Sequence, residues 1–295
     1  MIKIKFPNRI KSDLNGYLFL VKEYRKIKDV KAEEIYFDYS NTKWFDANML
    51  ALLGAMVENL YSKDNKVTIA NLIPKMENLF CRNHFLCFFG KQSLPDQYNS
   101  TVKYKRFDIS DIFSFDEYLE NDLFSKGDFP KISKLLRKKI RESSIEIFDN
   151  AVSHGECDNV FTCGQYYRGI YNRRLDFTIV DVGKSIRKNV RDFRGDPIIK
   201  GNEAIEWAVK RGNTTKTGTI PGGLGFSLIR EFLQKNGGKI QILSADGFWE
   251  ERGQNVNSEK MDGFFQGTIV NLEFNLNDKS YYYLKSEITN GEIPF

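Results

Sequence analysis

Residues 130–155 read PKISKLLRKKIRESSIEIFDNAVSHG, and residues 175–183 read LDFTIVDVG. The first stretch predicts a long helix that begins at Pro130 and reaches His154, because proline is favoured in a first helical turn and apolar residues recur at helical spacing. Gly155 stands where a glycine commonly ends a helix. The second stretch is apolar almost to its acidic end and predicts a buried strand. Together they indicate a mixed α/β fold.

Further elements surround these two. Upstream, residues 114–124 have a helical pattern. Strands are expected at 160–167, 239–245 and 267–276, helices at 202–210 and 224–235, and a polar connection at 247–263. Residues 211–223 are rich in glycine and threonine and too long for a tight turn, and loops of that kind are usually functional or disordered. A lid over a ligand would account for them.

The N-terminal part forms a separate pattern. Apolar and charged residues alternate from Ile2 to Phe6, which predicts a half-buried strand, and further strands are expected at 34–40 and 66–70. Asp46 is the expected N-cap of a helix that carries an apolar stripe from Leu50 to Leu60, and Pro74 is expected to open a short helix through Phe80. Strand, helix, strand, helix at this spacing predicts a small α/β module.

These patterns divide the chain into three parts. We expect one domain at residues 1–90, a connecting segment at 91–129 and a second domain at 130–295. Residues 90–105 are polar and carry little periodic hydrophobicity, so they are read as a linker.

Composition restricts the class of protein. The chain has 295 residues, of which 41% are hydrophobic, so a folded core is expected. The formal net charge of +5 comes from 44 Lys and Arg against 39 Asp and Glu, a mild excess that does not indicate nucleic acid as a partner. Four cysteines are too few for a disulfide scaffold of this length, and reduced thiols fit a cytoplasmic protein.

Membrane and secretory signals are also not expected. The N-terminus is charged throughout and lacks the apolar segment of a secretory signal. The longest apolar stretch, Met49 to Val57, is far shorter than the roughly 20 residues that cross a bilayer.

Glu146 and Asn150 are spaced i and i+4 on the long predicted helix, so both project from one face. A carboxylate and an amide placed this way can hold a water and a hard cation, and Mg²⁺ prefers such oxygen ligands. The alternative is that both lie on an ordinary solvated helix face.

Two glycine-containing segments follow. Asp181 ends its strand and precedes Val182 and Gly183, an arrangement suited to accepting a hydrogen bond from an amino-substituted heterocycle such as adenine, although it is also ordinary turn chemistry. Residues 221–225 read PGGLG and lead directly into an apolar helix, so their backbone N–H groups are suited to a phosphate. A flexible turn before a helix is the alternative for that segment.

The order of these motifs resembles the GHKL ATP-binding superfamily. Glu146-x-x-x-Asn150 is followed by Asp181-x-Gly183, a lid, Gly223-x-Gly225 and Gly267-Thr268 in the last strand. That superfamily comprises gyrase-type topoisomerases, ninety-kilodalton chaperones, histidine kinases and MutL. The resemblance covers residues 130–276 and implies a Bergerat fold, which is an α/β sandwich.

The resemblance also implies roles for single residues. Asn150 would coordinate Mg²⁺, and Glu146 would orient or activate the attacking water. Asp181 would accept from the adenine amino group, with Gly183 permitting its approach and Thr268 supporting the same pocket. Backbone amides at Gly223 and Gly225 would reach the phosphates of ATP, with Leu224 between them in the same site.

One position departs from the family pattern. The family motif Asp-x-Gly-x-Gly here reads DVGKS, so Ser185 replaces its second glycine. The contact of Asp181 with adenine should survive this change. We expect the start of the lid to be stiffer, because glycine is the more flexible residue.

Residues 1–90 resemble a STAS domain, the small α/β module of anti-sigma factor antagonists. The resemblance rests on YFDYSNTKWFDANMLALLGAMVENL and on KVTIANLIPKMENLF. In those antagonists a phosphorylatable Ser or Thr follows the Asp before the helix, whereas Ala47 and Asn48 stand here. This module is therefore expected to dock a partner and not to be switched by phosphorylation at that place.

Three weaker candidates remain. Cys81, His84 and Cys87 form C-x-x-H-x-x-C, which offers three zinc ligands where a structural site needs four, completed only if Cys157 and Cys163 came near. His154 lies inside the proposed nucleotide helix, so we do not expect it to be a phosphoacceptor. A basic stripe on the same helix is either a solvated face or a weak nucleic-acid contact, and it consists of Lys134, Arg137, Lys138 and Arg141.

The sequence therefore predicts a cytoplasmic Mg-ATP-binding protein with slow ATP hydrolysis that biases a conformational switch. An unidentified protein partner would read the switch, and a homodimer is one possible assembly. Two alternatives stay open: a serine/threonine protein kinase of the anti-sigma type, and a non-catalytic scaffold with a vestigial pocket.

Overall fold

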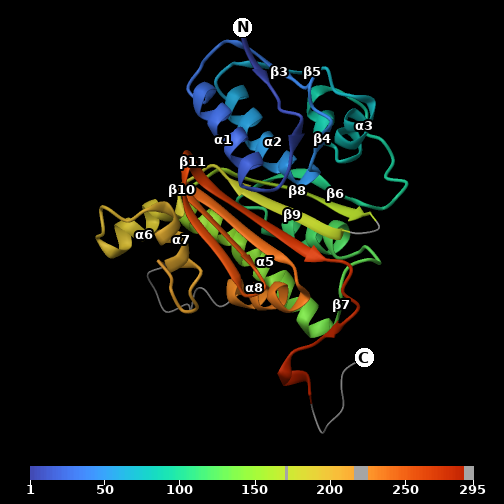
Figure 1. Cartoon of the computed structure of the whole chain (residues 1–295), viewed down its shortest axis with the longest axis vertical. Helices are drawn as coiled ribbons and strands as arrows, with labels where there is room; N and C mark the ends of the chain where they lie inside the picture. Colours follow the sequence, from blue (N-terminus) through green and yellow to red (C-terminus); the bar gives the residue numbers. More distant parts are fainter. Residues whose placement is uncertain (170–171, 216–224, 289–295) are drawn as a thin grey trace.

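A computed structural model describes residues 1–169, 172–215 and 225–288 (Figure 1). It contains helices and sheets in a mixed α/β fold, as the sequence predicted. Gly223 and Leu224 of the expected phosphate segment lie outside the described residues. Among the described residues, no helix combines the length and apolarity that crossing a bilayer demands.

A five-stranded antiparallel sheet forms the centre of the molecule. Its strands follow the order β10-β11-β9-β8-β6. Their bounds are β6 (Thr101–Asp108), β8 (Asn159–Arg168), β9 (Arg173–Asp181), β10 (Lys239–Arg252) and β11 (Asn255–Asn275). The expected strands at 160–167, 239–245 and 267–276 are thereby confirmed.

Helices cover one face of this sheet. The long helix α5 (Lys134–Gly155) and α8 (Gly225–Asn236) pack side by side on it, and α4 (Ile112–Tyr118) continues the layer toward β6 (Figure 1). The shorter helices α6 (Ile186–Arg194) and α7 (Gly201–Ala208) lie at the β10 edge. Phe177 and Leu272 of the sheet share a buried core with Phe148 of α5.

An N-terminal layer covers the opposite face. It has a parallel three-stranded sheet in the order β1-β3-β5, made of β1 (Ile2–Lys5), β3 (Glu34–Asp38) and β5 (Lys66–Ala70). Helices α1 (Leu14–Ile27) and α2 (Leu50–Tyr61) lie between the small sheet and the large one (Figure 1). The layer also holds α3 (Pro74–Arg82) and a short pair formed by β2 (Arg9–Ile10) and β4 (Trp44–Phe45).

Strand alternation explains how one sheet serves both layers. Successive side chains of a strand point to opposite faces. On β9, Phe177 and Ile179 belong to the core under α5, whereas Val180 belongs to the core shared with the N-terminal layer. Thr178 also faces that layer, since its hydroxyl receives a hydrogen bond of 3.0 Å from the side-chain amide of Asn48.

The interface between the layers contains buried polar groups. Asn48 is fully buried, and its amide donates to Thr178 and to Asn271 at 3.0 and 3.1 Å. Asp46 is 2% exposed and accepts from the backbone N–H of Ser12 at 2.9 Å. These contacts correct the expected N-cap role of Asp46, because its carboxylate is used by the layer interface and makes no side-chain capping bond to the 3-10 turn Ala47–Met49.

Two segments that the sequence predicted to be irregular form strands in the structure. Residues 101–105, placed in a linker, belong to β6, which pairs with β8 at the edge of the large sheet. Charged side chains of Lys103, Lys105 and Arg106 obscured its periodicity, and such charges are common on edge strands. The polar stretch 247–263 is a long hairpin in which β10 and β11 continue to the pair Arg252 and Asn255.

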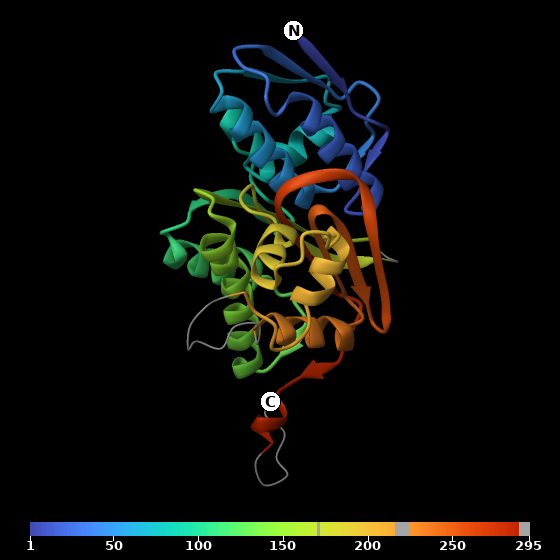
Figure 2. The same cartoon turned by 90° about the vertical axis from the view of Figure 1, so that its left-hand side faces the viewer.

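The hairpin reaches the N-terminal layer. Figure 2 shows it curling past the helices at the β10 edge toward α1. Lys22 of α1 pairs with Asp262 at 2.7 Å, and a Cβ atom on Gly263 would lie 3.1 Å from Leu18. Phe248 and Trp249 near its start are buried, whereas the polar residues 252–260 around the tip are exposed or half-buried.

The remaining elements are short. Strands β7 (Lys131–Ile132) and β12 (Tyr281–Tyr282) pair in parallel at the end of the molecule opposite the N-terminal layer (Figure 1). Short 3-10 helices occur at Phe85–Phe89 and Lys285–Glu287, and a short π-helix occurs at Leu119–Leu123.

Candidate functional site

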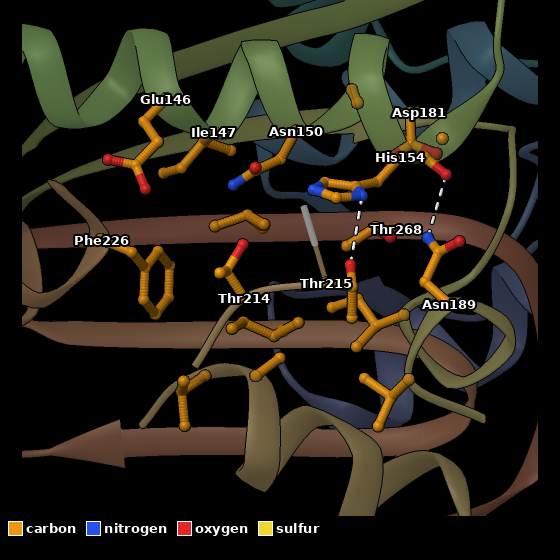
Figure 3. A pocket seen from close by; sticks show the side chains of 18 of the residues that line it. Glu146, Ile147, Asn150, His154, Asp181, Asn189, Thr214, Thr215, Phe226 and Thr268 are labelled. Atoms are coloured by element: carbon orange, nitrogen blue, oxygen red, sulfur yellow. Dashed lines mark hydrogen bonds between the residues drawn. The ribbon is translucent and has the colours of Figure 1, made fainter. Parts of the chain in front are cut away.

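A cavity lies between α5 and the strands that carry Asp181 and Thr268 (Figure 3). Helices α6, α7 and α8 and the segment after α7 close its other sides. Its polar lining residues are Glu146, Asn150, His154, Asp181, Lys184, Asn189, Asn213, Thr214, Thr215 and Thr268. The sequence-predicted residues of α5, β9 and β11 are therefore gathered at one place.

Glu146 and Asn150 owe their position to the pattern of α5. Ser133 caps this helix, since its hydroxyl accepts from the backbone N–H of Leu136 at 3.1 Å. Ile147 and Ala151 face the sheet and are buried. Glu146 and Asn150 precede these two residues and stand at the edge of the buried face, where both side chains point toward the cavity (Figure 3).

Asp181 is the last residue of β9 and lies opposite Thr268 of β11. Its side chain is 6% exposed and accepts a hydrogen bond of 3.0 Å from the backbone N–H of Gly183. Burial raises the pKa of Asp181 to about 7, although hydrogen bonds from Gly183 and Thr268 act in the opposite direction. This carboxyl group is thus a buried acceptor whose charge changes near neutral pH.

Glycines allow the end of β9 to approach the end of α5. A Cβ atom on Gly183 would lie 1.9 Å from the carbonyl oxygen of Gly155, and one on Gly267 would lie 1.9 Å from that of Asp181. The backbone N–H of Lys184 donates to the same Gly155 carbonyl. A glycine is needed at position 183 because the end of α5 packs closely against the end of β9 there. The sequence had suggested a different reason, which was room for a ligand.

Gly155 also differs from its expected role as the glycine that ends the helix. It is the last helical residue, and the left-handed conformation that follows belongs to Glu156, with φ 50°. Glutamate is uncommon there, because a Cβ atom is crowded in that region. Contact with Gly183 and Asp181 explains the glycine at 155, since a Cβ atom there would lie 3.3 Å from the Asp181 carboxylate.

Ser185 has a defined structural role. It is the N-cap of α6, and its hydroxyl accepts from the backbone N–H of Lys188 at 3.2 Å. The residue that replaces the second glycine of the motif therefore begins a helix. Helix α6 was missed in the sequence, because only Ile186, Val190 and Phe193 interrupt its polar run.

His154 is the main site residue that sequence reasoning left without a role in binding. Its Nδ1 lies 3.2 Å from the Thr215 hydroxyl, and its backbone carbonyl accepts from the Asn189 side chain at 2.9 Å (Figure 3). The signal was available, because His154 continues the i, i+4 series of Glu146 and Asn150. Lys184, which also lines the cavity, pairs with Glu156.

The glycine-rich segment is described only at its end. Gly225 is the first residue of α8, as expected for a segment that opens a helix. Phe226 follows and places its ring at the cavity, in the neighbourhood of Glu146 (Figure 3).

The weaker sequence candidates lie elsewhere. Within residues 1–169, 172–215 and 225–288, no group of three or more His, Cys, Asp or Glu side chains is arranged to hold a metal ion. Cys81, His84 and Cys87 therefore do not form such a group. In the basic stripe of α5, Arg137 pairs with Glu120 and Arg141 pairs with Asp116. These arginines are thus engaged within the chain.

The arrangement combines two chemical environments in one cavity. Near Asp181, the walls are the apolar side chains Ile179, Ile242 and Val270. Farther along α5, Glu146 and Asn150 supply oxygen ligands suited to a hard cation and to water. The chain matches neither a protein-family model nor a curated protein.

Proposed function

We propose that the chain binds Mg-ATP as a member of the GHKL superfamily and uses the nucleotide to drive a conformational switch that a partner protein reads. One observation carries the proposal: Glu146 and Asn150 of α5 face the same cavity as Asp181 of β9 (Figure 3). As part of it, we assign a Bergerat sandwich to residues 130–295 and a STAS-like module to residues 1–90.

The Asp181 end of the cavity suits adenine. An adenine base offers a flat apolar surface and an exocyclic amino group that must find an acceptor. Ile179 and Ile242 are each 2% exposed and provide apolar walls. The buried carboxylate of Asp181 supplies the acceptor, and Thr268 holds it from the neighbouring strand.

The other end of the cavity suits the phosphates. Asp181 lies beside Gly155, so Glu146 is nine residues away along α5, a rise of about 13 Å. A nucleoside triphosphate with its amino group at Asp181 would run along the helix past Asn150 toward Glu146. When bound, Mg²⁺ would neutralise part of the negative charge of the phosphates.

Each side chain of this end has a task in the proposal. The Asn150 amide oxygen is a ligand for Mg²⁺. Glu146 orients the attacking water molecule and accepts a proton from it, which is general-base chemistry. His154 and Thr215, joined by their hydrogen bond, link α5 to the segment that follows α7.

The N-terminal module is proposed to act by docking. Ala47 and Asn48 stand where anti-sigma factor antagonists carry a phosphorylatable Ser or Thr after the Asp, and both are fully buried. Neither residue has a hydroxyl group to phosphorylate, which favours docking as the role of this module. A nucleotide shifts a conformational equilibrium only by binding one state more tightly, and the layer on the back of the sheet is the element in position to respond. We further propose a cytoplasmic location and a homodimer as the assembly.

Thermal unfolding with nucleotides tests the proposal. Mg-ATP at about 100 times its dissociation constant should stabilise the protein by about 2.7 kcal/mol. The Asp181→Asn and Asn150→Ala variants should lose most of that gain, and Glu142→Gln on the same helix should keep it. Absence of any stabilisation of the wild-type protein by Mg-ATP would refute the proposal.

The fate of the γ-phosphate separates hydrolysis from phosphotransfer. With labelled ATP, release of free phosphate is expected for an ATPase. Label on a serine or threonine of a co-purified protein would instead identify the anti-sigma type of kinase. Binding without either product would leave a nucleotide-dependent scaffold.

A further inference from the structure

A second cavity lies on the N-terminal side of the large sheet. It opens where the C-terminal ends of α1 and α2 meet β9 and β11, and its volume is about 320 Å³. Val182 is among its lining residues, next in the chain to Asp181 of the first cavity. Asp181 ends β9 and Val182 follows it directly, so the end of β9 lies between the two cavities. The lining residues are Tyr24, Arg25, Lys28, Asp29, Asn59, Lys63, Val182, Phe264 and Gln266.

This second cavity carries an excess of positive charge. Arg25, Lys28 and Lys63 line it together with a single carboxylate, Asp29. Lys28 Nζ lies 2.8 Å from Asp29, which offsets one positive charge, and Lys63 donates to the Asn59 side chain at 3.1 Å. Two positive charges therefore remain without a matching carboxylate in the lining.

Arg25 is the cation with unused hydrogen-bonding capacity. Within the described part of the chain, its guanidinium group makes no ion pair of 4.0 Å or less and no side-chain hydrogen bond, in contrast to Lys28 and Lys63. A guanidinium group presents a planar set of donors that fits a carboxylate or a phosphate with two parallel hydrogen bonds.

Apolar surface accompanies the charge. Tyr24 is 6% exposed and forms part of the wall, and Val182 adds an aliphatic side chain. Phe264 is 43% exposed, so a large part of its ring faces solvent at the cavity. Burial of such a ring against an apolar group is favourable in proportion to the area removed from water.

We propose that this cavity binds a small organic anion, a carboxylate or a phosphate ester that carries an apolar group. Arg25 would pair with the anionic group, Lys28 and Lys63 would add positive potential, and Phe264 would cover the apolar part. A volume of about 320 Å³ corresponds to a small molecule and not to a folded partner.

Binding to the full chain without nucleotide tests the proposal. The probes are phenyl phosphate and benzoate, with benzyl alcohol as the uncharged comparison, and ligand-observed NMR titration gives the dissociation constants. At least one of the two anions should bind ten times more tightly than the alcohol. Which one binds identifies a phosphate or a carboxylate as the natural group.

Variants assign the binding to this cavity. Arg25→Gln should weaken the anion at least tenfold, and Lys28→Gln should weaken it in the same direction. Lys26→Gln is the matched control, because Lys26 is the next residue of α1, pairs with Glu23 at 2.6 Å and is not part of the cavity lining. Both lining variants remove surface charges, and their thermal unfolding shows whether they remain folded.

Three results would overturn the proposal. They are equal binding of benzyl alcohol and the anions, equal weakening by Lys26→Gln and Arg25→Gln, and displacement of the anion by a nucleotide in proportion to occupancy of the first cavity. The assay contains no nucleotide in its first stage, so a failure of ATP binding and a failure of this second site are separate outcomes.

Discussion

The carbonyl oxygen of Gly155 lies 1.9 Å from the place that a Cβ atom would occupy on Gly183. The end of α5 and the end of β9 therefore touch through their backbones, and the Lys184 N–H donates to the same carbonyl. This contact sets Asp181 beside the helix that carries Glu146 and Asn150. The geometry of the candidate site thus depends on a residue that has no side chain.

Gly183→Ala should destabilise the protein and disturb the cavity. The added methyl group has no space unless helix and strand separate, and overpacking of this kind costs about 1–3 kcal/mol. Thermal unfolding measures the loss. Gly127→Ala is the control, because a Cβ atom there meets nothing within 4 Å. Equal melting temperatures for the two variants would contradict the close contact.

Asp181→Asn should change how stability depends on pH. Burial raises the pKa of Asp181 in the folded protein to about 7, above the ordinary aspartate value of 3.8. The folded state therefore binds the proton more tightly, and this group favours folding at low pH and loses that advantage as the pH rises through 7. Asparagine does not ionise, so the variant should gain stability relative to wild type between pH 5 and pH 8, by about 2.7 kcal/mol, because each pH unit from 5 up to the pKa near 7 contributes about 1.4 kcal/mol.

Denaturant unfolding at several pH values measures this difference. The quantity to compare is the free energy of unfolding of the variant minus that of wild type, in which groups common to both cancel. A difference that stays constant from pH 5 to pH 8 would show that Asp181 titrates at its ordinary pKa.

Glu146→Gln should retain nucleotide binding and lose hydrolysis. Glutamine keeps the shape of the side chain but cannot accept a proton from water, and loss of a general base costs about 10²–10⁴ in rate. Phosphate release and thermal stabilisation by Mg-ATP are measured on the same preparation. Glu142→Gln, one turn earlier on α5 and paired with Lys139 at 2.7 Å, should change neither. Full hydrolytic activity in Glu146→Gln would assign the base elsewhere.

Asn48→Ala should loosen the N-terminal layer from the sheet. The variant removes two buried hydrogen bonds, to Thr178 and Asn271, and loss of buried polar contacts costs about 1–3 kcal/mol. Amide hydrogen exchange should increase in β9 and β11 as well as in α2. Asn41→Ala, at an exposed position, is the control. Faster exchange confined to α2 would mean that the two layers open independently.

Local pattern was enough for the long elements. Alternation or apolar runs identified β1, β3, β5, β8 and β9, and Pro74 marks the start of α3 as expected. Local pattern failed where the environment was unusual. The strand β6 is rich in polar side chains because it lies at an edge, and the hairpin residues 252–260 are polar because they surround an exposed tip. Their pairing partners, and not their composition, make them strands.

Helical and strand periodicity are local properties of the chain, and they were enough to predict the mixed α/β class and the i, i+4 placement of Glu146 and Asn150. Three relations are seen only in the folded chain: Asp181 lies beside α5, Gly183 packs against Gly155, and the N-terminal layer covers the other face of the large sheet. Those relations join residues distant in sequence, and they follow from side-chain packing and buried hydrogen bonds that no local pattern records.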